Sequence, residues 1–294
     1  MVSLAEAVEF LLTPSIPVVL LGLLILLGAP VLLHLIVASS STYTAPPTVL
    51  LLGPENAGKT ALLTLFERGS QPAQTHTTQT SHAVELSAST DSDSKTASFR
   101  YLDDASGTHT KFLLVDTPGH GKLRNVGLGR LARADRLRAV VFVVDAATLG
   151  EHDTLATTAA YLYDVLLFLQ RKASGAKSTP SSSSSSSAAV PVLVAANKMD
   201  LFTALPASLV RTHLEGEITR IRASRSKGLL DSGVGVDDVD AGGDQDGWLG
   251  EYGSDKFTFQ QMGEFDIDVD VVGGTVMTDE PGADKWWWWI AQRV

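Results

Sequence analysis

The chain has 294 residues, of which 44% are hydrophobic and 19% charged, and its formal net charge is −10. This composition excludes a wholly disordered chain, and the absence of cysteine excludes disulfides and cysteine-ligated metal sites. Eight acidic residues lie in 231–255, a stretch without Lys or Arg, so most of the negative charge belongs to one loop. No basic footprint for nucleic acid is present, and we expect no direct nucleic-acid partner.

The first patterned segment, residues 16–38, reads IPVVLLGLLILLGAPVLLHLIVA and contains no Asp, Glu, Lys or Arg. It is as long as the roughly 20 residues that cross a bilayer core of about 30 Å. We therefore expect an N-terminal segment, 1–38, that carries a transmembrane anchor. A cleaved signal peptide is the alternative, but its apolar core would be about 7–15 residues long and would follow basic residues, whereas Glu6 and Glu9 precede this one.

After a linker at 39–47, a single α/β domain is expected to occupy 48–294. Apolar runs and alternating patterns predict strands at 48–52, 139–144, 190–195 and 267–272. Helical periodicity and the position after the first strand predict helices at 61–67, 156–171, 208–222 and 283–293. Residues 99–102 and 111–115 are expected to form a hairpin. Strands that alternate with helices predict a mainly parallel sheet with one antiparallel edge.

Two segments of biased composition interrupt this pattern. Residues 173–189 include seven consecutive serines and are expected to form a flexible insertion. Residues 230–255 are acidic and rich in glycine, and we expect a disordered loop there.

The residues directly after the first predicted strand read GPENAGKT and match the phosphate-loop pattern G-x-x-x-x-G-K-[ST] in full. Glycines let the backbone turn so that successive N–H groups point at phosphate oxygens, and the following helix adds its positive N-terminal end. Lys59 would approach the β- and γ-phosphates, and the Thr60 hydroxyl would ligate Mg²⁺, which prefers hard oxygen ligands. The expected phosphate-binding residues are Gly53, Pro54, Glu55, Asn56, Ala57, Gly58, Lys59 and Thr60.

A second motif, DTPGH, follows the predicted strand KFLLV. Asp116 is expected to hold Mg²⁺ through a water molecule, and the Gly119 N–H to bond the γ-phosphate. Because that contact exists only with the triphosphate, it would act as a switch. His120 occupies the place where such enzymes carry the residue that orients the attacking water; packing or contact with a partner is the alternative for it.

A threonine that binds Mg²⁺ is expected before the predicted hairpin, in the threonine-rich stretch 74–81. Thr80 and Thr78 are the two candidates in this polar segment, and Thr80 is taken as the expected Mg²⁺ ligand.

A third motif, NKMD at 197–200, follows the strand VPVLVAA. The Asp200 carboxylate can accept hydrogen bonds from guanine N1–H and N2–H₂, a donor pair that adenine lacks, so this motif favours a GTPase over an ATPase. Asn197 can bond the base or the phosphate loop, and the aliphatic stem of Lys198 can cover the ring. A fourth nucleotide loop is expected either at 226–228, SKG, or at 273–275, GGT; the second follows a strand and is preferred, which makes Gly274 a guanine-binding candidate.

Together with the apolar N-terminal run, these motifs resemble the beta-subunit family of the signal recognition particle receptor. The resemblance rests on GPENAGKT, TQTS at 78–81, DTPGHGKLR at 116–124 and NKMD, and near the end on KFTFQQM, VDVVGGTVM and a tryptophan-rich helix. It covers the chain from about residue 14 onward.

The resemblance implies a P-loop, small-GTPase-like domain that binds GTP or GDP with Mg²⁺ and faces the cytosol from the endoplasmic reticulum membrane. It also implies that GTP-bound switch regions recruit the receptor alpha subunit, and that hydrolysis is slow and open to stimulation by a partner. The alternatives are another Arf- or Sar-like trafficking GTPase, and a GTP-binding assembly module with negligible hydrolysis.

Four adjacent tryptophans, 286–289, cover all sides of a helical turn and are therefore not all expected in the core. Trp286, Trp289 and Ile290 are expected to pack inward, which leaves Trp287 or Trp288 to contact a partner or the membrane interface, or to be partly exposed without a role.

Overall fold

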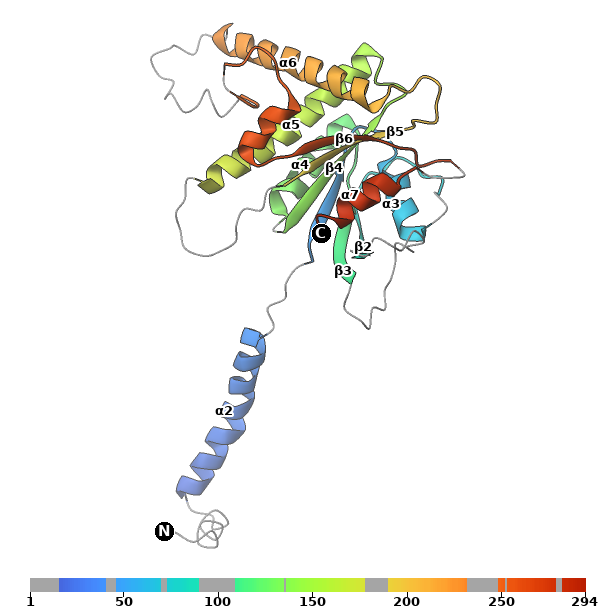
Figure 1. Cartoon of the computed structure of the whole chain (residues 1–294). Coiled ribbons are helices and arrows are strands. Elements are labelled where there is room, and N and C mark those ends of the chain that lie inside the picture. The colour runs from blue at the N-terminus through green and yellow to red at the C-terminus, as the bar shows by residue number, and fades with distance from the viewer. Residues whose placement is uncertain are drawn as a thin grey trace. The chain divides into compact units, whose positions relative to one another are not determined.

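Figure 1 shows the computed structural model of the chain. It describes residues 16–40, 46–69, 73–89, 109–134, 136–177, 190–231, 248–251, 253–278 and 282–294. The chain divides into two units, Met1–Ala45 and Pro46–Val294.

In the first unit the described residues form α2, Ile16–Ser40, which is free of charged residues and includes Pro30. Its large apolar side chains, such as Leu24 and Leu32, are exposed. Within the described part of the chain, which leaves out the side chains at 18, 21 and 36–40, no helix is both long and apolar enough to cross a membrane.

The second unit is built on a six-stranded sheet in the order β2-β3-β1-β4-β5-β6. The strands are β1 Thr48–Leu52, β2 His82–Ser89, β3 His109–Asp116, β4 Leu137–Asp145, β5 Val192–Asn197 and β6 Val269–Gly273. The β2–β3 pair is antiparallel and the other four pairs are parallel. The expectation of a mainly parallel α/β sheet with one antiparallel edge is confirmed, and in such sheets ligands bind beyond the carboxyl ends of the strands.

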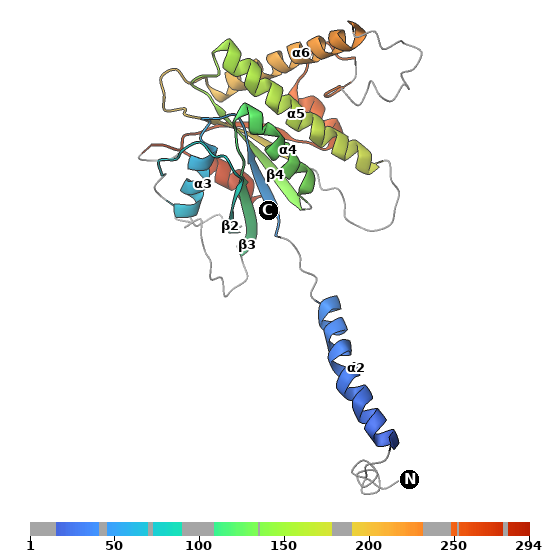
Figure 2. The same cartoon turned by 180° about the vertical axis from the view of Figure 1, so that it is seen from behind.

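Helices cover both faces of the sheet (Figures 1 and 2). They are α3 Lys59–Arg68, α4 Arg124–Arg133, α5 His152–Lys177, α6 Ala207–Asp231 and α7 Asp284–Ala291, with 3-10 turns η1 Gly121–Leu123 and η2 Phe259–Phe265. Alternate residues of a strand point to opposite faces. Val140 and Phe142 of β4 therefore join the hydrophobic cluster under α4, α5 and α6, whereas Val141 and Val143 join the one under α3 and α7.

The antiparallel edge differs from the predicted hairpin in its first strand. β3 pairs with β2 in a register that runs from His82 opposite Asp116 to Ser89 opposite His109. The sequence HAVELSAS of β2 alternates, and Val84, Leu86 and Ala88 are its buried apolar side chains, but serine-rich surroundings mask this period-2 signal. The predicted strand at 99–102 lies outside the described residues.

The sequence predicts a disordered loop at 230–255, but the last part of this acidic segment is packed against α5 and α6. Gln170 of α5 donates to the Trp248 carbonyl (2.9 Å) and accepts from the Gly250 N–H (2.8 Å). The buried Arg222 of α6 donates to the carbonyls of Leu249 and Ser254, and its guanidinium lies 4.2 Å from the centre of the Trp248 ring. Long-range contacts therefore order residues whose composition alone favours disorder.

The boundaries of the two biased segments also shift. α5 continues through Lys177 and α6 through Asp231, so each helix extends into the segment expected to be irregular. Residues 178–189 and 232–247 lie outside the described part of the chain.

α7 buries three of the four adjacent tryptophans. Trp286 is fully buried and Trp289 nearly so, as expected, and their indole N–H groups donate to Val272 O (3.0 Å) and Asp270 Oδ2 (2.7 Å). Trp287 is also buried, with its ring 5.1 Å from that of Phe66 and 5.9 Å from that of Phe112. Of the two tryptophans left for a partner or the membrane interface, Trp287 is therefore packed inside, because α3 and the β3 face leave a space that this indole fills, and Trp288 is the partly exposed one.

Candidate functional site

The loop between β1 and α3 has the backbone that a phosphate cradle requires. Gly53, Asn56 and Gly58 all have positive φ angles, 134°, 60° and 95°. A side chain on Gly53 would clash with the Val143 carbonyl, and one on Gly58 with the amide of Asn197. The loop therefore turns sharply and directs its N–H groups and the first turn of α3 toward one space, as anion-binding loops do.

Lys59 crosses this loop from the start of α3. The side chain is 6% exposed, and its ammonium donates to the Pro54 carbonyl at 2.6 Å. Burial lowers the pKa of Lys59 to about 8, although the charges of Asp116 and Glu55 act in the opposite direction. A buried ammonium whose hydrogen bond among the described residues is to a neutral carbonyl is well suited to an incoming phosphate.

Three oxygen-bearing side chains meet beside Lys59. The Thr60 hydroxyl donates to Asp116 Oδ2 at 2.6 Å, the Thr78 hydroxyl to the same oxygen at 3.3 Å, and the two hydroxyls lie 2.6 Å apart. Burial raises the pKa of Asp116, against the hydrogen bonds from Thr60 and Thr78 and the charge of Lys59. The other carboxylate oxygen, Oδ1, is buried and has no hydrogen-bond partner among the described residues.

This donor set fits Mg²⁺, because two hydroxyls and a carboxylate are hard oxygen ligands and one carboxylate oxygen is still available. Of the two threonines weighed from the sequence, Thr78 lies in the cluster. Thr80 is exposed, and no hydrogen bond from it to Thr60 or Asp116 is found in the described part of the chain.

The segment after β3 closes against the phosphate loop. Thr117 donates to the Leu51 carbonyl at 2.7 Å, which fixes the start of the turn. A side chain on Gly119 would lie 2.6 Å from Pro54 O and 2.7 Å from Glu55 N, so only glycine permits this approach. The backbone of Gly119 is thus held next to the loop expected to bind the phosphates.

His120 follows Gly119 and is exposed. Its Nδ1 accepts a hydrogen bond from the Lys122 N–H at 3.3 Å, so the imidazole caps the first turn of η1. In this conformation the ring is engaged with the backbone of its own turn.

The NKMD motif lies at the end of β5. Asn197 is buried and donates to the Ala57 carbonyl at 2.8 Å, whereas its Oδ1 has no partner within the described residues. Lys198 has a positive φ of 65°, and its ammonium contacts Asp145 Oδ2 at 2.6 Å. The Asp200 carboxylate is exposed and accepts from the Thr275 hydroxyl at 2.8 Å.

The loop 273–275 is the one that lies beside NKMD. Gly274 donates to the Ala196 carbonyl (2.9 Å) and accepts from the Met199 N–H (3.2 Å). The rival fourth loop, 226–228, is part of α6. The carboxyl ends of β1, β3, β5 and β6 therefore bring the four predicted loops together.

Two side chains of this region carry no motif signal. Asp145 ends β4 and pairs with Lys198, and Thr275 orients Asp200. An Asp that ends an apolar run, and a Thr after two glycines, could have been suspected only if the pairing of β4, β5 and β6 had been known.

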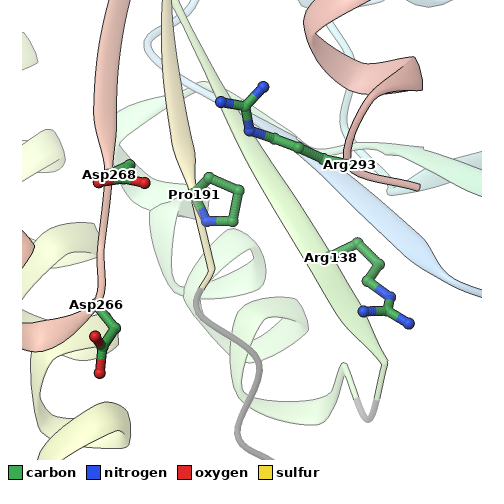
Figure 3. A pocket seen from close by; sticks show the side chains of 5 residues that line it. All are labelled: Arg138, Pro191, Asp266, Asp268 and Arg293. Carbon is green, nitrogen blue, oxygen red and sulfur yellow. The ribbon is translucent and has the colours of Figure 1, made fainter.

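A separate hollow of about 200 Å³ lies at the amino ends of β4, β5 and β6, opposite to the carboxyl ends that form the site (Figure 3). Four of its lining residues, Arg138, Pro191, Asp266 and Asp268, stand at or before the starts of β4, β5 and β6, and the fifth, Arg293, follows α7. It is therefore distinct from the site formed by the carboxyl ends.

The strand order, the phosphate loop after β1 and the motifs after β3 and β5 define a P-loop protein with the small-GTPase fold. Residues 44–265 match the family model described as "Signal recognition particle receptor beta subunit". Since this match covers most of the chain, the chain belongs to that family, which confirms the resemblance seen in the sequence.

Curated relatives carry the same family name. The "Signal recognition particle receptor subunit beta" of Saccharomyces cerevisiae is 30% identical over 184 residues, which is 62% of this chain and 61% of the yeast protein. The human protein of the same name is 36% identical over 113 residues, 38% of this chain and 35% of its own length. The matches thus span about three fifths of the yeast relative and about a third of the human one.

Solved structures agree on the fold. "Signal recognition particle receptor SRb-GTP/SRX complex from Chaetomium thermophilum" is 42% identical, with a TM-score of 0.67, and the match covers 84% of this chain and all of that chain. SRb-GDP and SRb-GDP-Mg from the same organism have TM-scores of 0.60 and 0.59, each at 42% identity over 86% of this chain and all of that chain.

Proposed function

We propose that this chain binds GTP and GDP with Mg²⁺ at the carboxyl ends of β1, β3 and β5. The observation that carries the proposal is that Lys59, the Thr60–Asp116–Thr78 cluster and the NKMD loop converge at the carboxyl ends of the strands. The Chaetomium relatives, solved with GTP, GDP and GDP-Mg, support the same nucleotide class.

Each residue has a defined task in this proposal. Backbone N–H groups of 55–60 and the Lys59 ammonium bind the phosphates. Thr60, Thr78 and Asp116 hold the metal ion, which neutralises phosphate charge when bound. Asp200, oriented by Thr275, accepts from guanine N1–H and N2–H₂, and Asn197 fixes the NKMD loop to the phosphate loop. The Gly119 N–H reports the presence of a γ-phosphate.

Replacing Asp200 tests base recognition. In Asp200→Asn the amide cannot accept from both guanine donors, so GTP affinity should fall about 100-fold or more, and the preference for GTP over ATP should fall with it. Isothermal titration calorimetry of wild type and variant with GTP and ATP measures this. Asp268→Asn, at the amino ends of the strands, is the matched control and should bind GTP as wild type does. No heat with GTP in wild type, or an unchanged purine preference in Asp200→Asn, would contradict the proposal.

We further propose that the chain is the membrane-anchored subunit of the receptor, with residues 16–38 as a single span in the endoplasmic reticulum membrane and the GTPase domain in the cytosol. The uncharged sequence of 16–38 and the exposed apolar side chains of α2 support this. After alkaline carbonate extraction, full-length protein should stay in the membrane pellet and a chain beginning at residue 46 should not. Release of the full-length protein would contradict a span.

GTP-dependent recruitment of the receptor alpha subunit completes this proposal. Support comes from the Chaetomium relative, solved as an SRb-GTP/SRX complex, and from the position of Thr78 and Gly119 in loops that would contact the γ-phosphate and metal. A pull-down of the alpha subunit should succeed with GTP and fail with GDP. Binding with neither nucleotide would reject the assignment of this partner.

A second candidate function is a nucleotide-dependent assembly module with negligible hydrolysis. It is favoured by His120, whose exposed imidazole caps η1. Single-turnover hydrolysis of GTP by wild type and His120→Ala separates the two: a fall of about 100-fold or more would show general-base or water-orienting chemistry, and equal rates would remove the catalytic role.

A further inference from the structure

Asp145 occupies the last position of β4, directly opposite Asn197 at the end of β5. Only 7% of it is exposed, and both carboxylate oxygens are engaged. Oδ1 accepts from the Ala147 N–H at 3.0 Å, and Oδ2 contacts the Lys198 ammonium at 2.6 Å. A nearly buried carboxylate thus joins the turn after β4 to the second residue of the NKMD motif.

Lys198 needs such a partner. Its φ of 65° places a non-glycine residue in the left-handed region, which occurs where surrounding contacts determine the backbone. A lysine side chain has many rotamers, and fixing one costs conformational entropy. The turn after β4 also holds the backbone before and after the motif, because the Ala146 N–H donates to Asn197 O at 3.0 Å and the Leu205 N–H donates to Ala146 O at 2.9 Å.

We propose that Asp145 is a positioning residue for guanine recognition: it fixes the ammonium of Lys198 and thereby holds the aliphatic stem in the orientation in which it covers the purine ring. The inference rests on the nucleotide site proposed above. Asp145 itself touches no phosphate-binding residue among its described contacts, so its effect should be confined to the base end of the nucleotide.

This role has a distinctive kinetic signature. In Asp145→Asn the amide can still accept from Ala147, but it no longer attracts the ammonium, so Lys198 loses its fixed rotamer. GDP and GTP should then both dissociate roughly tenfold faster, a factor in the range of couplings between contacting residues. Because the defect lies at the base, the ratio of GTP to GDP affinity should not change. A residue needed only for folding would lower thermal stability without this equal effect on both nucleotides.

The test measures dissociation of fluorescent GDP and GTP analogues from full-length wild type, Asp145→Asn, Lys198→Met and the double variant. We expect the double variant to release nucleotide no faster than Lys198→Met, because Asp145 acts through that lysine. Asp145→Ser, which keeps an acceptor for Ala147, should behave as Asp145→Asn does and provides the measurement if the latter does not fold.

The matched control is Asp164→Asn, which removes a carboxylate from another ion pair, with Arg225 at 2.9 Å on α5 and α6, outside the nucleotide site. It should leave both dissociation rates unchanged. The inference would be overturned if Asp145→Asn and Asp145→Ser released nucleotide at the wild-type rate, or if the effect of Asp145→Asn added to that of Lys198→Met. Neither result would count against the nucleotide site itself as long as the wild-type protein binds guanine nucleotide. Failure of wild type to bind any guanine nucleotide would instead reject the site itself.

Discussion

At the scale of single residues, Gly119 lies so close to the phosphate loop that no side chain fits between them. Replacement by alanine would place a methyl group against Pro54 O, Glu55 N and the Lys59 ammonium. The segment after β3 would be pushed away, and its N–H could no longer reach a γ-phosphate. A hydrogen bond to a charged group contributes about 1.5–3 kcal/mol.

We therefore expect Gly119→Ala to weaken GTP binding by roughly 10- to 100-fold and GDP binding far less. Calorimetry with both nucleotides checks this. Gly121→Ala is the matched control, because no atom lies within 4 Å of the position its methyl group would take. An equal loss for GTP and GDP in Gly119→Ala would show that the residue shapes the loop rather than sensing the third phosphate.

Tyr161, on α5, gives a prediction about pH. The phenol is fully buried against the ring of Phe142, 5.4 Å away, with Arg124 on its other side, and burial raises its pKa to about 12. In the unfolded chain a tyrosine titrates near 10. Between pH 10 and 12 the folded state therefore holds the proton more tightly than the unfolded state, and the free energy of unfolding must fall as pH rises.

For wild type, the loss of unfolding free energy from this titration reaches roughly 2–3 kcal/mol by pH 12. Tyr161→Phe should not show this loss. The difference in unfolding free energy between the two proteins should therefore be constant below pH 10 and shift in favour of the variant above pH 10. Urea unfolding from pH 8 to 11.5 measures the difference, and other titrating groups cancel in it. Parallel curves throughout would show that the phenol is not held neutral by burial.

At the scale of elements, α7 closes the face of the sheet that carries α3. Trp287 fills the space between Phe66 and Phe112, whereas Trp288 is partly exposed. Trp287→Ala should therefore lower the free energy of unfolding by about 3–5 kcal/mol, as buried tryptophans do, and Trp288→Ala, its neighbour on the same helix, by about 1 kcal/mol or less. Equilibrium urea unfolding compares them; equal losses would contradict the observed packing of α7.

Elements with a strong local pattern could be predicted from the sequence. The run TVLLL is apolar at four consecutive positions and forms β1 at the predicted bounds 48–52, and the phosphate loop follows it because glycines and a following helix specify that turn locally. α4 was missed because RNVGLGRLAR carries few apolar residues, of which Leu131 is the one fully buried. β2 and the packed stretch after Trp248 depend on partners far along the chain, such as β3 and Arg222.

The same distinction applies within the site. Lys59, Asp116 and Asp200 belong to motifs that can be recognised from local spacing. Each motif follows a strand, so a parallel sheet brings all three to the carboxyl ends of the strands. The contact of Asp145 with Lys198 depends instead on the register between β4 and β5, which residue spacing does not reveal. The choice between Thr78 and Thr80 likewise depends on the path of the loop before β2, which brings the Thr78 hydroxyl to Thr60 and Asp116 and which local spacing does not reveal.

At the scale of the whole molecule, the site and both hydrophobic clusters belong to one unit, Pro46–Val294. Every strand of the sheet lies in this unit, and so does each side chain assigned to the nucleotide. Many basic residues also lie away from the site: Arg130, Arg133 and Arg138 are on α4 and at the start of β4. We therefore expect nucleotide binding to depend on local charges such as Lys59 rather than on the net charge of the chain.

It follows that residues 46–294 alone should fold and bind guanine nucleotide as the full-length chain does. A domain of this size buries enough apolar surface for an independent core, and all six strands found in the described part of the chain lie within the unit. Dissociation constants for GDP should agree within about twofold, a difference below ~0.5 kcal/mol, when the excised domain is compared with full-length protein in detergent. Thermal unfolding should be one cooperative transition that shifts upward with added GDP, because a ligand that binds only the folded state stabilises it. Loss of cooperative unfolding on excision would show that the N-terminal segment contributes to the fold, and retained folding with lost GDP affinity would show that it contributes to the site.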